Sequence, residues 1–399
     1  MPALMEAGLS AAHRPAEPEQ PGPWRTAARA ALIVWVVFTV MHLAVSALAW
    51  LPRGGGDTPA PDVWTTVLGW NNWDAGHYVT IAERGYRLGP GFPAFFPLFP
   101  LLVRAVNVVA PGDGVVAALI VANAAAIGAL AVLHRLADHE FGPRVAQRVT
   151  WYLAAFPMGF FLFIGYNESL FLLLAVGALY AGRRGHWWLA GALGALSSAT
   201  RLFGLLLVLP LAVEYLRQAG WQPRRIRADV LGLALVPLGV VAYSVYCAVE
   251  LGSPLAFSIA QDQWGRQYTF PGGAWFTAVG QIGDDPLSPG TLGALVDAGT
   301  MLVAVLLLIL TTVGPWKFRR DQMYLVVQTG LTLLMLMSTE VGGRSMQSAA
   351  RYAMEAVAVL LVLARIGSHP MTDRAVLVTG VSLHAVFLVI FMSGTFLVA

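Results

Sequence analysis

The segment around residue 74 carries the side chains in this sequence that are best suited to acid–base chemistry. It places the carboxylate of Asp74 and the imidazole of His77 among Asn72, Trp73 and Tyr78. A carboxylate removes a proton from a hydroxyl as a general base. Aromatic rings stack on sugar faces while amide and imidazole groups bond sugar hydroxyls, so the segment favours a sugar site. An interfacial belt of Trp and Tyr is the alternative for the rings, but it does not explain Asp74 or His77.

A second set of polar residues lies at the ends of apolar stretches. It comprises Asn167, Glu168, Arg201, Arg344, Arg351 and Tyr352. A charge at the membrane edge is costly unless it is paired or faces a wet cavity, so we expect these residues to line a cavity. Arginine offers phosphate a planar fork of donors, which makes Arg201 and Arg351 the candidates for binding a phosphate, with Arg344 as a further anion ligand.

Structural alternatives stay open for the same residues. Asn167 and Glu168 also suit the start of a helix, as N-cap and first-turn acid. Arg201 is long enough to snorkel toward the membrane surface. Arg344 and Arg351 are also placed for ordinary contact with lipid phosphates. The basic clusters between apolar stretches are interpreted as topology signals only.

The elements that position these residues are apolar helices. Hydrophobic residues make up 57% of the 399 residues and charged residues 12%, whereas soluble domains carry about 25% charged residues. Because a membrane span needs about 20 apolar residues, we expect an all-α polytopic membrane protein with about eleven spans. They fall near 31–51, 115–137, 149–164, 168–182, 187–200, 203–217, 229–250, 290–313, 321–338, 352–366 and 375–396. Spans three to six are short and closely joined, which indicates broken or tilted helices around a cavity.

The distribution of basic residues predicts the orientation. A cytoplasmic N-terminus puts 17 of the 25 Lys and Arg residues inside, as the positive-inside rule requires. Residues 52–110 then form an outer catalytic loop. Its stretch 92–110 has several prolines and Arg104, so we expect it to lie in the interface or re-enter rather than span. Residues 1–30 are expected to be a disordered cytoplasmic segment, and 31–399 a single transmembrane domain.

Several kinds of chemistry have no motif in this chain. There is no paired His/Cys spacing for a metal, no Walker loop, no G-x-S-x-G and no dinucleotide fingerprint on a strand. We therefore assign no metal ligand and no cofactor, although a divalent cation stays open. The lone Cys247 excludes an intramolecular disulfide. The basic residues lie between spans, so no nucleic-acid partner is expected.

Five motifs in order resemble the PIG-V family, which contains the eukaryotic GPI mannosyltransferase II and bacterial PIG-V-like proteins. The first two are Trp73-Asp74-Ala75-Gly76-His77-Tyr78-x-x-Ile81-Ala82-x-x-Gly85-Tyr86 and Ala94-Phe95-Phe96-Pro97-Leu98-Phe99-Pro100-Leu101. The others are Tyr166-x-Glu168-Ser169-Leu170-Phe171, Ala199-Thr200-Arg201-x-x-Gly204 and Ser348-x-x-Arg351-Tyr352. Gly76 departs from the pattern, where a side chain is expected between Asp and His.

The resemblance implies a GT-C-type transmembrane bundle that transfers a sugar, usually mannose, from a polyprenyl-phosphate donor. An acidic residue of the first outer loop, here Asp74, is implied as the base, and the reaction inverts the anomeric carbon. The acceptor is a lipid-linked or glycan acceptor on the non-cytoplasmic face of the cell membrane. High Ala, Gly and Arg content suggests a GC-rich bacterial source. A lipid or sugar transporter or flippase without catalysis is the main alternative, and a scaffold subunit that has lost catalysis is another.

Overall fold

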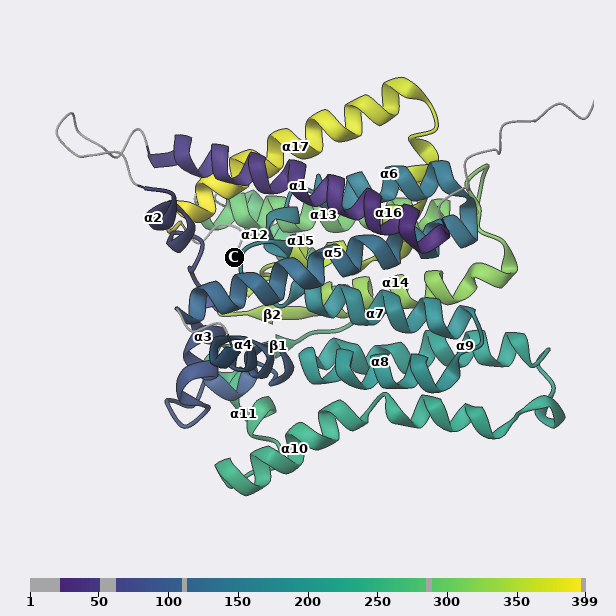
Figure 1. Cartoon of the computed structure of the whole chain (residues 1–399), viewed down its shortest axis with the longest axis horizontal. Helices are drawn as coiled ribbons and strands as arrows, with labels where there is room; N and C mark the ends of the chain where they lie inside the picture. The colour runs from purple at the N-terminus through teal and green to yellow at the C-terminus, as the bar shows by residue number, and fades with distance from the viewer. Residues whose placement is uncertain (1–21, 51–61, 110–112, 285–288, 396–399) are drawn as a thin grey trace, which may run out of the picture.

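The computed structural model describes residues 22–50, 62–109, 113–284 and 289–395, which fold into a bundle of helices with a small sheet at one end (Figure 1). Within these ranges, four helices are long and apolar enough to cross a membrane. They are α1 (Pro23–Trp50), α5 (Gly114–Phe141), α13 (Pro289–Leu310) and α17 (Pro370–Met392). Helix α1 begins at one end of the bundle and α17 ends at the other (Figure 1).

Shorter helices fill the rest of the bundle. They are α6 (Pro143–Ala154), α7 (Glu168–Arg183), α8 (Trp187–Thr200), α9 (Val208–Gln218), α10 (Leu238–Leu251), α14 (Met323–Leu336) and α16 (Val357–Ile366). Several are extended by 3₁₀ turns, namely η3 (Gly159–Leu162), η4 (Leu202–Leu207), η5 (Pro223–Arg225), η6 (Ala228–Leu235), η7 (Arg320–Gln322) and η8 (Ala353–Glu355).

Each of the eleven predicted ranges contains helix, but most of these helices are too short to count as spans by themselves. A residue of α-helix rises 1.5 Å, against a hydrocarbon core about 30 Å thick. Among the described residues, four helices qualify, or five if η6 and α10 form one span bent by 45°. Pro237 lies at that bend, where it cannot supply a helical N–H. The structure thus shows a mostly helical membrane protein with four to five candidate spans, and the count of eleven stays a prediction.

Two features differ from the sequence-based expectation, the start of the first helix and the presence of a small sheet. Helix α1 starts at Pro23, so residues 23–30 are helical rather than disordered, since proline is favoured in the first turn of a helix; residues 1–21 lie outside the described part. The stretch 92–110, by contrast, agrees with the expectation that it does not span. Its described residues contain η2 (Phe92–Ala94) and α4 (Leu98–Val109), a helix of 12 residues that is not among the span candidates.

The second difference is a small antiparallel sheet in a fold expected to be all helical. It is formed by β1 (Gln267–Tyr268), β2 (Thr339–Val341) and β3 (Arg344–Ser345) in the order β1-β2-β3. Gln267 pairs with Glu340, and Glu340 with Ser345. These strands are too short to show the alternating pattern by which strands are recognised in a sequence.

Close helix contacts depend on small side chains. Helix α5 packs on α1 and α7, among other helices. Its residues Ala122, Ala126 and Ala129 are fully buried, and such small side chains allow helix axes to approach. Where α8 crosses η6, a Cβ on Gly191 would lie 1.9 Å from the carbonyl oxygen of Gly232. Glycine is therefore required at this crossing.

The remaining helices lie toward the same end of the bundle as the sheet (Figure 1). They are α2 (Val63–Leu68), α3 (Asp74–Arg84), α11 (Ala256–Gln263), α12 (Gly273–Asp284) and α15 (Ala349–Tyr352). The opposite end holds the connections between α5 and α6, between α7 and α8, and between α9 and η6 (Figure 1).

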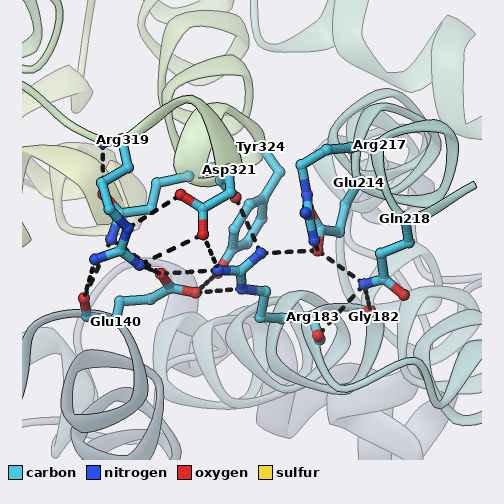
Figure 2. A network of polar contacts seen from close by, with 10 residues as sticks. Glu140, Gly182, Arg183, Glu214, Arg217, Gln218, Arg319, Asp321 and Tyr324 are labelled. Carbon is cyan, nitrogen blue, oxygen red and sulfur yellow. Dashed lines mark hydrogen bonds and ion pairs between the residues drawn. The ribbon is translucent and has the colours of Figure 1, made fainter. Parts of the chain in front are cut away.

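A network of ion pairs joins helices at that opposite end (Figure 2). We call it the basal network; it consists of Glu140, Arg183, Glu214, Arg319 and Asp321. Arg183 lies at its centre and contacts Glu140 at 2.6 Å, Asp321 at 2.6 Å and Glu214 at 3.2 Å. Burial raises the pKa of Asp321, but hydrogen bonds from Arg183 and Arg319 outweigh this and hold that pKa at about 2. The basic loops therefore do more than set topology.

Candidate active site

Helix α3 positions Asp74 as its first residue. The preceding Trp73 adopts φ 57° and ψ −124°, a conformation that residues other than glycine rarely take and that often marks functional sites. The helix is fixed because Tyr78 and Val79 pack against Phe99 of α4. As a result, the carboxylate of Asp74 projects at the N-terminus of a held helix, where negative charge is favoured.

Arg351 of α15 binds the carboxylate of Asp74. Its Nη2 lies 3.0 Å from Oδ2 of Asp74, and the side chain of Arg351 is 3% exposed against 28% for Asp74. The short helix α15 follows Ser348, which has φ 65°, and Met346, which has φ 55°. Unusual backbone therefore occurs on both sides of this ion pair, a pattern of local strain that is typical of functional sites.

Behind this pair lies a second guanidinium held by carboxylates. Nη2 of Arg201 is 2.5 Å from Oε1 of Glu168, and its Nη1 is 2.5 Å from Oε1 of Glu355. The same Oε1 of Glu168 lies 3.2 Å from Nε of Arg351. Glu168 thus links the two arginines. Nε of Arg201 also donates to Oδ1 of Asn167 at 2.8 Å.

Aromatic rings enclose both guanidiniums. The ring of Tyr352 lies 4.6 Å from the guanidinium carbon of Arg201 and 4.6 Å from that of Arg351. Phe161 and Tyr166 cover Arg351 at 5.1 and 5.4 Å. Such contacts favour a desolvated cation and limit the rotamers of both arginines. The cluster of Asp74, Glu168, Arg201, Arg351 and Glu355, which we call the charge cluster, is therefore rigidly placed.

The charge cluster opens into a cavity of about 230 Å³. His77 forms part of its wall, with ring contacts to Phe95 at 5.0 Å, Phe92 at 5.5 Å and Trp264 at 5.4 Å. Burial raises the pKa of the Tyr78 hydroxyl well above its usual range, so this hydroxyl keeps its proton and remains a donor. The cavity thus combines aromatic walls with donors and one partly exposed carboxylate.

Most of the residues expected at the site do line this cavity. They are Trp73, Asp74, His77, Tyr78, Asn167, Arg201, Arg351 and Tyr352. Three others lie elsewhere. Glu168 lies behind the cavity wall and is 2% exposed. Asn72 does not line the cavity, and its Nδ2 donates to the carbonyl of Gly69 at 3.0 Å. Arg344 is exposed on β3.

The structure also decides between the alternatives for two of these residues. The Arg201 side chain is 12% exposed and ion-paired, so it does not snorkel to the surface. Asn167 occupies the N-cap position of α7 but makes no side-chain capping bond. Instead, its Nδ2 donates to the carbonyl of Thr200 at 3.2 Å, which ties it to the arginine that follows.

The sequence did not predict Glu355 of the charge cluster, nor the part of the cavity wall that residues 261–266 contribute. Glu355 follows the last motif and precedes the apolar run 357–364; an acid there requires a partner, which was a usable signal. Gln261, Trp264 and Arg266 reach the cavity from α11 and the turn before β1. No local pattern shows that this segment folds back against α3.

Among the described residues, no group of three or more His, Cys, Asp or Glu side chains is placed to hold a metal ion.

Comparisons with known proteins point to one family. Residues 62–219 match the family described as Mannosyltransferase (PIG-V). The chain is 32% identical over 216 residues to GPI alpha-1,6-mannosyltransferase 2 of Rattus norvegicus, covering 52% of this chain and 42% of that protein. It is 31% identical over 244 residues to GPI mannosyltransferase 2 of Yarrowia lipolytica, covering 58% of this chain and 64% of that protein. These matches span about half the length of the mammalian relatives. Both named relatives are eukaryotic, so they lend no support to a bacterial source.

The fold has a counterpart among solved structures. The crystal structure of ArnT from Cupriavidus metallidurans bound to undecaprenyl phosphate superposes with a TM-score of 0.52 at 15% identity, covering 91% of this chain and 76% of that one. This likeness concerns the fold alone. The matched family region holds Asp74, Glu168 and Arg201, whereas Arg351 and Glu355 come from beyond it. Through residues 62–219, this chain is related to the PIG-V mannosyltransferases, and its fold resembles that of ArnT.

Proposed function

We propose that this protein is a GT-C-type α-mannosyltransferase that takes mannose from a polyprenyl-phosphate donor and inverts the anomeric carbon. The observation that carries the proposal is Asp74, a partly exposed carboxylate held by Arg351 at the wall of an aromatic cavity. The acceptor is the hydroxyl of a lipid-linked sugar or glycan. The relationship to GPI mannosyltransferases supports the choice of mannose, and ArnT with undecaprenyl phosphate supports a lipid-linked donor.

In the proposed reaction, Asp74 acts as the general base. An acceptor hydroxyl gives its proton to the carboxylate while its oxygen forms a bond to the anomeric carbon. The bond from that carbon to the phosphate oxygen breaks, and its electron pair leaves with the polyprenyl phosphate. Because a phosphate leaves without much help from an acid, base catalysis and stabilisation of the anion are the main contributions required of the protein.

The other cavity residues suit substrate binding. Trp73 and His77 offer aromatic faces and a ring nitrogen to a sugar, and Tyr78 offers a hydroxyl. Arg201 and Arg351 remain the sequence-based candidates for the phosphate. Nη1 of Arg351 has no hydrogen-bond partner among the described groups, which supports that role for Arg351. Arg344 is left out of the proposal because it is exposed and does not line the cavity.

The simplest test is turnover. Purified protein incubated with labelled polyprenyl-phosphomannose and candidate acceptors should form a new glycosidic bond. The alternative of a transporter or flippase without catalysis has the same cavity available to it. It is favoured if label crosses vesicle membranes while no mannosylated product forms with any acceptor.

We further propose that the site end of the bundle faces the non-cytoplasmic side of the cell membrane, with the N-terminus inside. Helix α2 lies at the site end and the connection between α9 and η6 at the opposite end (Figure 1). Single cysteines at Val63 and Arg224, both exposed, should therefore react with an impermeant maleimide from opposite sides. Val63 is chosen because the neighbouring Asp62 accepts a bond from the Thr65 N–H at 2.7 Å and caps α2.

The native Cys247 is buried and serves as the background control in cells without an introduced cysteine. Intact cells should label the Val63→Cys protein, and the Arg224→Cys protein should label only after permeabilisation. Equal labelling of both in intact cells contradicts the orientation.

A further inference from the structure

The charge balance of the cavity requires a cation in addition to the two arginines that are held in the ion pairs of the charge cluster. Asp74, Glu168 and Glu355 set three carboxylates against the two guanidiniums of Arg201 and Arg351. A phosphate that approaches either arginine meets these carboxylates at ion-pair distance. Because like charges repel strongly where water is scarce, the cluster alone is a poor anion site.

Arg266 is the cavity residue that supplies this charge. It lines the same cavity as Asp74 and Arg351. Within the described residues, its guanidinium has no ion pair with a carboxylate, and its Nε is buried without a hydrogen-bond partner. Buried polar groups are nearly always satisfied, so a buried donor beside a cavity is a sign of a ligand that completes it.

The chain is anchored just before and just after Arg266. Before it, Nε1 of Trp264 donates to the carbonyl of Gly91 at 3.1 Å, and the N–H of Gly342 donates to the carbonyl of Gly265 at 3.1 Å. After it, Gln267 of β1 pairs with Glu340 of β2. Gly265 has φ +62°, and a Cβ there would lie 3.1 Å from the Gly342 backbone. Glycine is needed for this close approach, which holds the turn carrying Arg266 against the sheet.

We propose that Arg266 binds the phosphate of the lipid-linked sugar donor, an inference that rests on the proposed function. A sugar phosphodiester carries one negative charge and gains a second as the bond to the anomeric carbon breaks. An arginine that is not neutralised by a carboxylate binds the growing charge more strongly than the ground state. The amides of Gln261 and Gln347 line the same cavity and offer neutral donors to the remaining phosphate oxygens.

The experiment measures binding of a short-chain polyprenyl phosphate, the product of transfer, to the full chain in phospholipid-free detergent. Arg266→Gln should raise the Kd of polyprenyl phosphate by about 10- to 100-fold, the contribution of a charge-assisted hydrogen bond. Arg266→Lys should raise it by less. Binding of the uncharged polyprenol should not change. Arg104→Ala is the matched control, because Arg104 is exposed on α4 and does not line the cavity.

Two results overturn the assignment. One is a Kd for polyprenyl phosphate that is equal in the wild type and both Arg266 variants, or that rises as much in Arg104→Ala. The other is that phosphatidylglycerol at the same concentration fully displaces polyprenyl phosphate. That result would show that the site binds a lipid headgroup and not the donor. Melting temperatures identify a variant that has failed to fold. If Arg266→Gln fails to fold, the Kd of Arg266→Lys is compared with that of the wild type instead. Since binding is measured without transfer, the role of Arg266 is tested separately from the proposed catalytic function.

Discussion

Asp74→Asn should lower mannosyl transfer by about 10²- to 10⁴-fold, the usual weight of a general base. The substitution keeps the size of the side chain and one oxygen for Arg351, which lies 3.0 Å from the carboxylate, but it removes the group that takes the proton. Binding of polyprenyl phosphate should change little, since the phosphate is held by arginines. The measurement is the initial rate of transfer at saturating donor, together with donor Kd.

The control for this substitution must separate chemistry from folding. If Asp74 served only to start α3, Asp74→Asn would lower the melting temperature, since it weakens the interaction with the helix N-terminus. Glu83→Gln on the same helix is the matched variant, because Glu83 is exposed at the far end of α3. A folded Asp74→Asn protein with a normal transfer rate would remove Asp74 from the mechanism and make Glu168 the next candidate.

Much of the site was predictable because its residues are costly where they lie. Asp74, Glu168, Arg201 and Arg351 come from segments far apart in the sequence, yet the structure joins them by ion pairs. These residues could be predicted to come together because charges at membrane edges need partners. The same reasoning did not specify which partners. Two carboxylates hold Arg201, so a residue expected to face a phosphate is instead largely neutralised inside the protein.

What escaped prediction depends on contacts between distant segments. Trp264 and Arg266 reach the cavity because β1 pairs with β2, and a strand of two residues leaves no periodic signal. Helix breaks had a similar cause. The 3₁₀ turn η4 between α8 and α9 follows Arg201, whose backbone is extended (φ −156°, ψ 147°). The ion pairs of Arg201 hold this extended conformation, and a hydropathy pattern does not predict it.

The basal network gives the largest expected effect on stability. Arg183→Met should lower the free energy of unfolding by about 3–5 kcal/mol, because it leaves buried carboxylates without their cation. Glu140 and Glu214 have side chains only 0% and 1% exposed and both contact Arg183. The measurement is thermal unfolding in one detergent, with transfer assayed below the transition. The matched control is Arg87→Met, whose ion pair with Glu250 is 74% and 42% exposed and should contribute at most about 1 kcal/mol.

A second substitution identifies the cause of this loss. If the cost is the unpaired charge of Glu140, then Glu140→Gln in the Arg183→Met background should restore part of the stability, although Glu140→Gln alone should destabilise the protein. Arg319 and Tyr324 also contact the Glu140 carboxylate, so the restoration should be incomplete. The sign of the coupling between the two substitutions is the readout. Simple addition of the two losses would show that Arg183 acts through packing, and that the ion pairs visible in Figure 2 contribute little to joining the helices at this end.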